Sequence, residues 1–241
     1  MQVIFVGIAV FYGIMITLMC WRVKEGEYPP PEQEDHSHWW SGVKNYAREC
    51  FGCGYFWWVF LAYSCVVWSN LSNAFMVFFF RDEIGFSLDA FGKLMAMGLG
   101  IAAIVAYPAG ILVDRWGSHK TLIASQMAIA VVCVLAFLTI HDKWSAGIWL
   151  IALFLCNSLP QLAVMKWTVD VYPRERYGQF GSAGAMFSSL GAVLLSLLCG
   201  GIMDWFKIYR FFWLWIAAFT LLGAAMAMIV YRKQNGRLQH C

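Results

Sequence analysis

The feature that most constrains the fold of this chain is a series of seven apolar segments, each roughly 20 residues long. They lie at about 3–21, 55–80, 91–113, 120–140, 145–168, 178–203 and 211–231. A helix of this length crosses the hydrocarbon core of a bilayer. In lipid the backbone polar groups must be paired within helices or a closed barrel, and the short alternating segments of a barrel are not evident. We therefore predict an all-α polytopic membrane protein with seven transmembrane helices.

The composition supports a membrane protein. Hydrophobic residues make up 61% of the 241 residues and charged residues 13%, whereas soluble domains are about 45–50% apolar and about 25% charged. The first segment has no basic residue ahead of its apolar run, which is atypical of a signal peptide. The eight cysteines do not suggest a disulfide framework. Several lie within spans, where a thiol behaves as a small apolar residue, among them Cys65, Cys133, Cys156 and Cys199.

The basic residues predict the orientation. With the N-terminus outside, eleven of the 17 lysines and arginines fall on the inner side, five fall on the outer side, and Lys166 lies near the inner end of the fifth span. The positive-inside rule favours this arrangement. We expect an integral, multi-pass protein of the plasma or inner membrane, with a cytoplasmic loop at 22–54 and a cytoplasmic tail at 232–241.

The loop at 22–54 is the only long one. It begins acidic and proline-rich, which is typical of an extended linker, and its aromatic and basic second half could form a short helix at the membrane surface. His36, His38, Cys50 and Cys53 could together hold zinc, but their spacing fits no common zinc pattern. We therefore favour a linker and expect no metal, no cofactor and no nucleic-acid partner.

Two spans carry small residues at every fourth position. Residues four apart share one face of a helix, and a small-residue face lets another helix approach closely in a membrane. We expect helix packing at these positions, which are Gly98 and Ala102 in the third span and Gly184, Ser188, Ser196 and Gly200 in the sixth.

Two other spans carry polar side chains. Such residues within a membrane usually face a bundle interior or a wet cavity, and Pro160 can kink the fifth span, as is frequent at transporter sites. Neutral amides suit hydroxyl-rich ligands, and indole rings can stack on a sugar, although the amides could instead bond neighbouring helices. The candidate solute-binding residues are Trp68, Asn70, Asn73, Asn157 and Gln161.

The segment "GILVDRWGSHK" resembles the signature loop of the major facilitator superfamily. Gly110, Asp114, Arg115, Gly117 and Lys120 fit that loop, whereas Ser118 and His119 stand where the family usually has two basic residues. The segment "DVYPRERYGQFGS" resembles the family's acidic-x-x-Pro segment at Asp170, Pro173 and Arg176. The short match between "AGILVDRW" and "GGIMDW" is consistent with an inverted repeat of three plus three spans.

The resemblance implies an organisation in two halves. Residues 1–21 would be the sixth span of the family, 22–54 the central loop, and 55–231 a six-helix C-terminal half with the 3+3 inverted repeat. The partner would be the N-terminal six-helix half, of which this sequence contains only the last span. The third and sixth spans would then face that half, and the second and fifth would line the solute cavity.

The implied function is secondary active transport of a small solute by alternating access. The neutral amides favour a sugar or polyol as the solute, with an aromatic drug-like solute as the alternative. Asp114, Arg115, Asp170 and Arg176 would form an inner gate. Lys166 would pair with Asp170, four residues on. No carboxylate lies deep within a span, so a residue that couples transport to a proton or sodium ion would lie in the other half.

Two further classes remain open. The chain could be a seven-helix receptor, or a structural membrane subunit that pairs with a separate N-terminal half. A membrane enzyme is disfavoured because no cluster of His, Asp and Glu lies within the spans.

Overall fold

The computed structural model describes residues 2–23 and 39–234, and the elements in these ranges are all helical. Six segments are long and apolar enough to cross a membrane: Gly54–Glu83, Leu88–Trp116, Ser118–Thr139, Lys143–Val171, Arg174–Phe206 and Phe211–Gln234. A shorter apolar helix, Val6–Arg22, lies within α1 (Gln2–Arg22). The predicted fold class is confirmed. The histidines of the zinc alternative and the last seven residues of the tail lie outside the described residues.

The chain divides into two compact units, residues 1–41 and 42–241. The first contains α1. Helix α2 (Trp39–Phe51) begins three residues before the second unit. The other elements of the second unit are α3 (Gly54–Ser69), η1 (Asn70–Ser72), α4 (Asn73–Phe78), η2 (Phe79–Glu83), α5 (Leu88–Trp116), α6 (Ser118–Thr139), α7 (Lys143–Val171), η3 (Arg174–Arg176), α8 (Tyr177–Phe206) and α9 (Phe211–Gln234).

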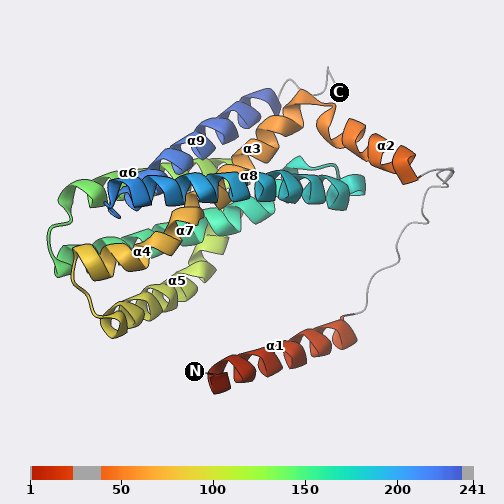
Figure 1. Cartoon of the computed structure of the whole chain (residues 1–241). Helices are drawn as coiled ribbons and strands as arrows, with labels where there is room; N and C mark the ends of the chain where they lie inside the picture. The colour runs from red at the N-terminus through yellow and green to blue at the C-terminus, as the bar shows by residue number, and fades with distance from the viewer. Residues whose placement is uncertain (1, 24–38, 235–241) are drawn as a thin grey trace. The chain divides into compact units, whose positions relative to one another are not determined.

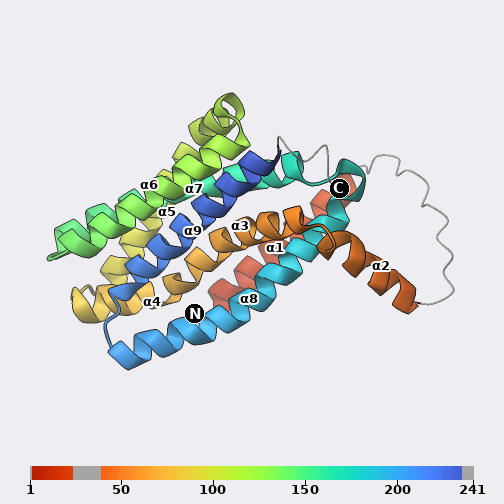
Figure 2. The same ribbon diagram turned by 90° about the horizontal axis from the view of Figure 1, so that it is seen from above.

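The second unit is a helical bundle in which α9 packs against α3 and α6, α7 packs against α5 and α6, and α8 packs against α3 (Figures 1 and 2). Its buried side chains form two apolar clusters. One contains Phe60 and Trp167, and the other contains Phe80, Leu150 and Trp213. Helices α5 and α8 are the least covered by the rest of the bundle. Only 17% of the most apolar 18-residue stretch of each of their spans is buried, against 56% in Gly54–Glu83.

The small residues of α5 and α8 lie partly against aromatic rings of the same bundle. A Cβ at Gly98 would lie 2.5 Å from Phe154 of α7, and one at Gly184 would lie 3.2 Å from Phe60 of α3. Ser188 is buried, Ala102 and Gly200 are half-buried, and Ser196 is exposed. At Gly98 and Gly184 the small residue therefore accommodates a ring rather than a second helix backbone.

Polar caps set several helix ends that the apolar runs do not reveal. The Ser87 hydroxyl accepts the Ala90 N–H at 3.2 Å and begins α5 three residues before the apolar run. Gly117 ends α5 and precedes α6 with φ of 84°, a left-handed backbone region that glycine adopts most easily. This glycine forms the tight turn between α5 and α6.

The hydrogen bonds at the beginning of α7 predict that the stability of the folded chain depends on pH. Asp142 accepts the Ser145 N–H at 2.8 Å while the Ser145 hydroxyl accepts the Asp142 N–H at 3.2 Å, a capping box. Hydrogen bonds from the side chain and then the backbone of Ser145 lower the pKa of Asp142 below its ordinary 3.8. Because the pKa of Asp142 is lower in the folded than in the unfolded state, the Asp142 carboxylate stabilises the folded state at pH values above 3.8. This stabilisation is lost as the pH falls below that value.

We expect Asp142→Ala to lower the melting temperature of the purified chain at pH 6, and the difference from wild type to shrink below about pH 4. Asp204→Ala serves as a control, because Asp204 is an exposed carboxylate without a hydrogen bond or ion pair to the described residues. A difference that stays constant down to pH 3 would show that the carboxylate charge does not contribute to the cap.

Candidate functional site

The first polar site lies where the second predicted span departs from α-helical geometry. The backbone N–H of Asn70 bonds to the Val67 carbonyl, a three-residue step, and Asn70–Ser72 form a 3-10 turn. The Val66 carbonyl instead accepts the Asn70 Nδ2 at 2.8 Å and the Ser69 hydroxyl at 2.9 Å. Side chains thus satisfy the carbonyl at the break, and 3-10 segments within helices often mark functional positions.

Three predicted amides meet at this break and form what we call the amide cluster: Asn70, Asn73 and Asn157. Asn70 Oδ1 accepts Asn73 Nδ2 at 3.0 Å and Asn157 Nδ2 at 3.3 Å, so the cluster joins the Asn70–Asn73 break to α7. Asn73 Oδ1 is buried and has no donor among the described residues. A buried acceptor without a donor is costly, so this atom offers a place for an incoming N–H or O–H group.

The other two candidate solute-binding residues lie apart from these bonds. The indole N–H of Trp68 donates to the Ser188 carbonyl at 2.9 Å, and the Trp68 side chain is buried against α8. Gln161 is exposed, and its side chain makes no hydrogen bond within residues 39–234. Trp68 is therefore placed to join α3 to α8, and only the three asparagines form a connected polar group.

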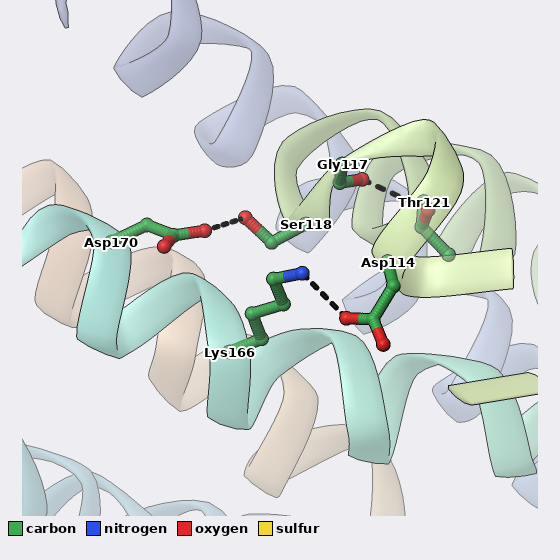
Figure 3. A network of polar contacts seen from close by, with 6 residues as sticks. All are labelled: Asp114, Gly117, Ser118, Thr121, Lys166 and Asp170. Atoms are coloured by element: carbon green, nitrogen blue, oxygen red, sulfur yellow. Dashed lines mark hydrogen bonds and ion pairs between the residues drawn. The ribbon is translucent and has the colours of Figure 1, made fainter. Parts of the chain in front are cut away.

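The second polar site joins the turn between α5 and α6 to α7 (Figure 3). Lys166 Nζ lies 2.6 Å from Asp114 Oδ1, and the Ser118 hydroxyl donates to Asp170 Oδ2 at 2.5 Å. The expectation that Lys166 pairs with Asp170 is wrong. Although both belong to α7, each contacts a different residue of the α5–α6 turn, because α7 packs against both neighbouring helices.

The remaining gate candidates have separate surroundings. Arg176 lies 3.0 Å from Glu49 of α2, and Gln179 Nε2 donates to the same carboxylate oxygen at 3.0 Å. Arg115 and Lys120 are exposed and form no ion pair within the described part of the chain. Beyond its neighbours in α5, no atom of the described residues lies within 4 Å of a Cβ placed at Gly110, and Pro173, which is half-buried, precedes the η3 turn. The gate candidates therefore form two groups, one around Asp114 and one around Arg176.

The imidazole of His119 adds a further link at the same end of the bundle. The Trp167 indole N–H donates to His119 Nδ1 at 2.8 Å, which requires that nitrogen to be unprotonated. The Tyr231 ring of α9 lies 5.6 Å from the imidazole centroid. The beginning of α6, the end of α7 and the end of α9 therefore meet around His119.

Comparison with known proteins identifies the family of this chain. Residues 1–160, more than half of the chain, match the model of the Major Facilitator Superfamily. This chain belongs to the Major Facilitator Superfamily. It is therefore an integral, multi-pass membrane protein of a transporter family, and its resemblance to transporters does not favour an enzyme.

The superfamily relatives include named transporters. The lysosomal dipeptide transporters MFSD1 of Pongo abelii and Homo sapiens are each 26% identical over 164 residues, which cover 67% of this chain and 35% of theirs. Solute carrier family 22 member 1 of Bos taurus is 25% identical over 134 residues, covering 53% of this chain and 22% of its own. The chain spans about a third of the length of the dipeptide transporters that it matches.

The structure gives no support to the zinc alternative in this superfamily member. The Cys50 sulfur lies 3.8 Å from the Gln179 carbonyl, and burial raises the pKa of this thiol, with a smaller contribution from Glu49, which disfavours the thiolate that zinc binds. Cys53 is disulfide-bonded, whereas Cys65, Cys133, Cys156 and Cys199 are free thiols. No group of three or more metal-ligating side chains occurs among the described residues.

Sequence reasoning missed three contributors to these sites. Ser118 was noted only as a departure from the family motif, yet it binds Asp170. Glu49 and Trp167 were not candidates at all. The spacing could have indicated Ser118. Asp114 and Ser118 lie four residues apart, as do their partners Lys166 and Asp170, so two contacts can form side by side between the two pairs.

Proposed function

We propose that this chain supplies half of a secondary active transporter that moves a small polar solute by alternating access, with the solute bound at the amide cluster. The observation that supports this proposal is the buried Oδ1 of Asn73, which lies beside an interrupted helix and has no donor in the described part of the chain. Transporter sites commonly lie at such interruptions between opposing halves. In this proposal an N–H or O–H group of the solute donates to Asn73 Oδ1.

A short peptide is the solute class that we favour. Its amide N–H would donate to Asn73 Oδ1, and its carbonyl would accept from an asparagine Nδ2. The dipeptide transporters among the relatives add weight to this class, whereas no relative's name points to a sugar. Sugars and polyols, which present hydroxyl groups to the same atoms, are the alternative. Coupling to a proton or sodium, the N-terminal partner half, an inside C-terminus and a plasma or inner membrane location remain predictions.

The contacts at the α5–α6 turn suggest how the two access states are balanced. We define the latch as Asp114, Lys166, Ser118 and Asp170. If the latch forms in only one state, it biases the equilibrium towards that state. The side chains of Lys166 and Asp114 are 39% and 72% exposed, so their pair contributes about 0–1 kcal/mol. A contribution of 1 kcal/mol shifts an equilibrium about fivefold.

We expect Asp114→Asn to change the uptake rate of the assembled transporter in liposomes by up to about fivefold, with little change in melting temperature. The assay would supply a labelled dipeptide, a sugar and a polyol in separate arms. Lys93→Gln is the matched control, because it breaks the Asp89–Lys93 pair within α5 alone. The double variant Asp114→Lys with Lys166→Asp restores opposite charges and should recover uptake.

Two outcomes would count against these proposals. Uptake that is unchanged in Asp114→Asn, or not recovered by the charge swap, would remove the latch. Absence of uptake in every solute arm, with a correctly assembled protein, would instead favour the receptor or structural-subunit alternatives.

A further inference from the structure

An apolar groove lies between α6 and α9. Its volume is about 310 Å³, and its lining comes from Met127 of α6 and five apolar residues and one arginine of α9. The lining residues of α9 are Leu221, Ala224, Ala225, Met228, Ile229 and Arg232. Buried Ala224 is its least accessible lining residue, while Met127, Leu221 and Met228 remain 39–44% exposed.

The groove is located where a lipid chain can reach it. Both α6 and α9 are long and apolar enough to span a membrane. The exposed sides of such helices contact hydrocarbon, and the methionine side chains adapt readily to a flexible apolar partner. The walls along α6 and α9 therefore suit an acyl chain.

One end of the groove carries a cation that has no partner among residues 39–234. Arg232 lies in the last turn of α9, is exposed, and makes no ion pair or hydrogen bond within residues 39–234. Lys233 beside it lies 5.2 Å from the Trp58 ring centroid, so its ammonium already has a partner. Guanidinium groups bind phosphate through several parallel hydrogen bonds.

The surrounding charges at this end favour an anion. The contact between Tyr231 and His119 brings the end of α9 next to the beginning of α6, where Lys120 is also exposed. Of the carboxylates at the ends of α5 and α7, Asp114 pairs with Lys166, while Asp170 accepts the Ser118 hydroxyl and keeps its negative charge. Basic pockets between transmembrane helices bind the headgroups of anionic lipids.

We propose that the α6–α9 groove binds one anionic phospholipid, with an acyl chain along Met127, Ala225 and Met228 and the phosphate at Arg232. The apolar walls and the cation at one end match the two parts of such a molecule. A zwitterionic lipid would offer the same chains but a neutral headgroup, so charge at Arg232 is the source of selectivity. This proposal stands independently of the transported solute.

The test measures lipid binding to the purified full chain in mild detergent by native mass spectrometry and by thermal shift. Phosphatidylglycerol, phosphatidylcholine and inorganic phosphate are added in separate arms. We expect phosphatidylglycerol to bind and raise the melting temperature, with phosphatidylcholine binding at least fivefold more weakly, as expected for one arginine at an anionic headgroup. Phosphate alone should give no stabilisation.

Four variants locate the binding. Arg232→Gln should weaken phosphatidylglycerol binding about fivefold, and Ala225→Leu, which fills the groove, should weaken both lipids. Arg174→Gln removes an exposed arginine of the η3 turn, and Ala218→Leu enlarges an exposed alanine of α9 outside the groove, so both should bind as wild type does. Melting temperatures without lipid check folding. Equal phosphatidylglycerol binding by wild type and Arg232→Gln, or equal binding of the two lipids by wild type, would overturn the proposal.

Discussion

Replacing Gly191 by alanine is expected to destabilise the bundle by about 1–3 kcal/mol, the cost of overpacking a well-filled interior. A Cβ at this position would lie 2.7 Å from Cε2 of Trp68 and closer still to Cζ2. The indole cannot move aside freely, because its N–H donates to the Ser188 carbonyl and the Trp68 carbonyl accepts the Trp215 indole N–H, both at 2.9 Å. The measurement is the melting temperature of the purified chain.

Gly201→Ala is the matched control, because Gly201 also lies in α8 but has no atom within 4 Å of an added Cβ. Alanine there should be neutral or stabilise the helix by up to about 1 kcal/mol. A second comparison combines Gly191→Ala with Trp68→Phe, which removes the outer indole ring and should reduce the penalty. Equal melting temperatures for Gly191→Ala and Gly201→Ala would show that Trp68 does not limit the spacing of α3 and α8.

The approximate extents of the six long apolar segments could be predicted because hydrocarbon imposes a length on every apolar run. The run at 91–113 corresponds to Leu88–Trp116, and its ends extend beyond the apolar residues because Ser87 and Gly117 set them. The interruption at Asn70–Ser72 was not predicted. Asparagine and serine occur in packed membrane helices as well as in breaks, so their identity alone does not show where the backbone changes.

The partners of the charged residues could not be read from local spacing. Lys166 and Asp170 are four residues apart, and this spacing on an isolated helix favours a pair. Their observed partners are each 52 positions away along the chain. These contacts depend on the packing of α7 against α5 and α6, which a pattern within one helix does not contain. By contrast, the hydrogen bond between Asn157 and Asn70 is an interhelical bond of the kind that the sequence allowed as the alternative to solute binding.

Replacing Asn73 by leucine is expected to raise the KM of the assembled transporter for its solute about tenfold, the equivalent of about 1.4 kcal/mol for one buried hydrogen bond. The variant removes the proposed acceptor Oδ1, while Asn157 still donates to Asn70 at 3.3 Å. The turnover number should change less than KM if the lost contact holds the solute equally throughout the cycle. Uptake into liposomes over a range of solute concentrations separates the two quantities.

Gln161→Leu provides the control, since Gln161 is an exposed amide on the same helix as Asn157 and lies outside the amide cluster. Its KM should stay close to that of wild type. Asn157→Leu should have an intermediate effect, because it removes a donor to Asn70 but leaves Asn73 Oδ1 in place. If Gln161→Leu raised KM and Asn73→Leu did not, the solute would bind along the exposed side of α7. The amide cluster would then serve to join the Asn70–Asn73 break to α7, and the interrupted helix would be a packing feature rather than a binding site.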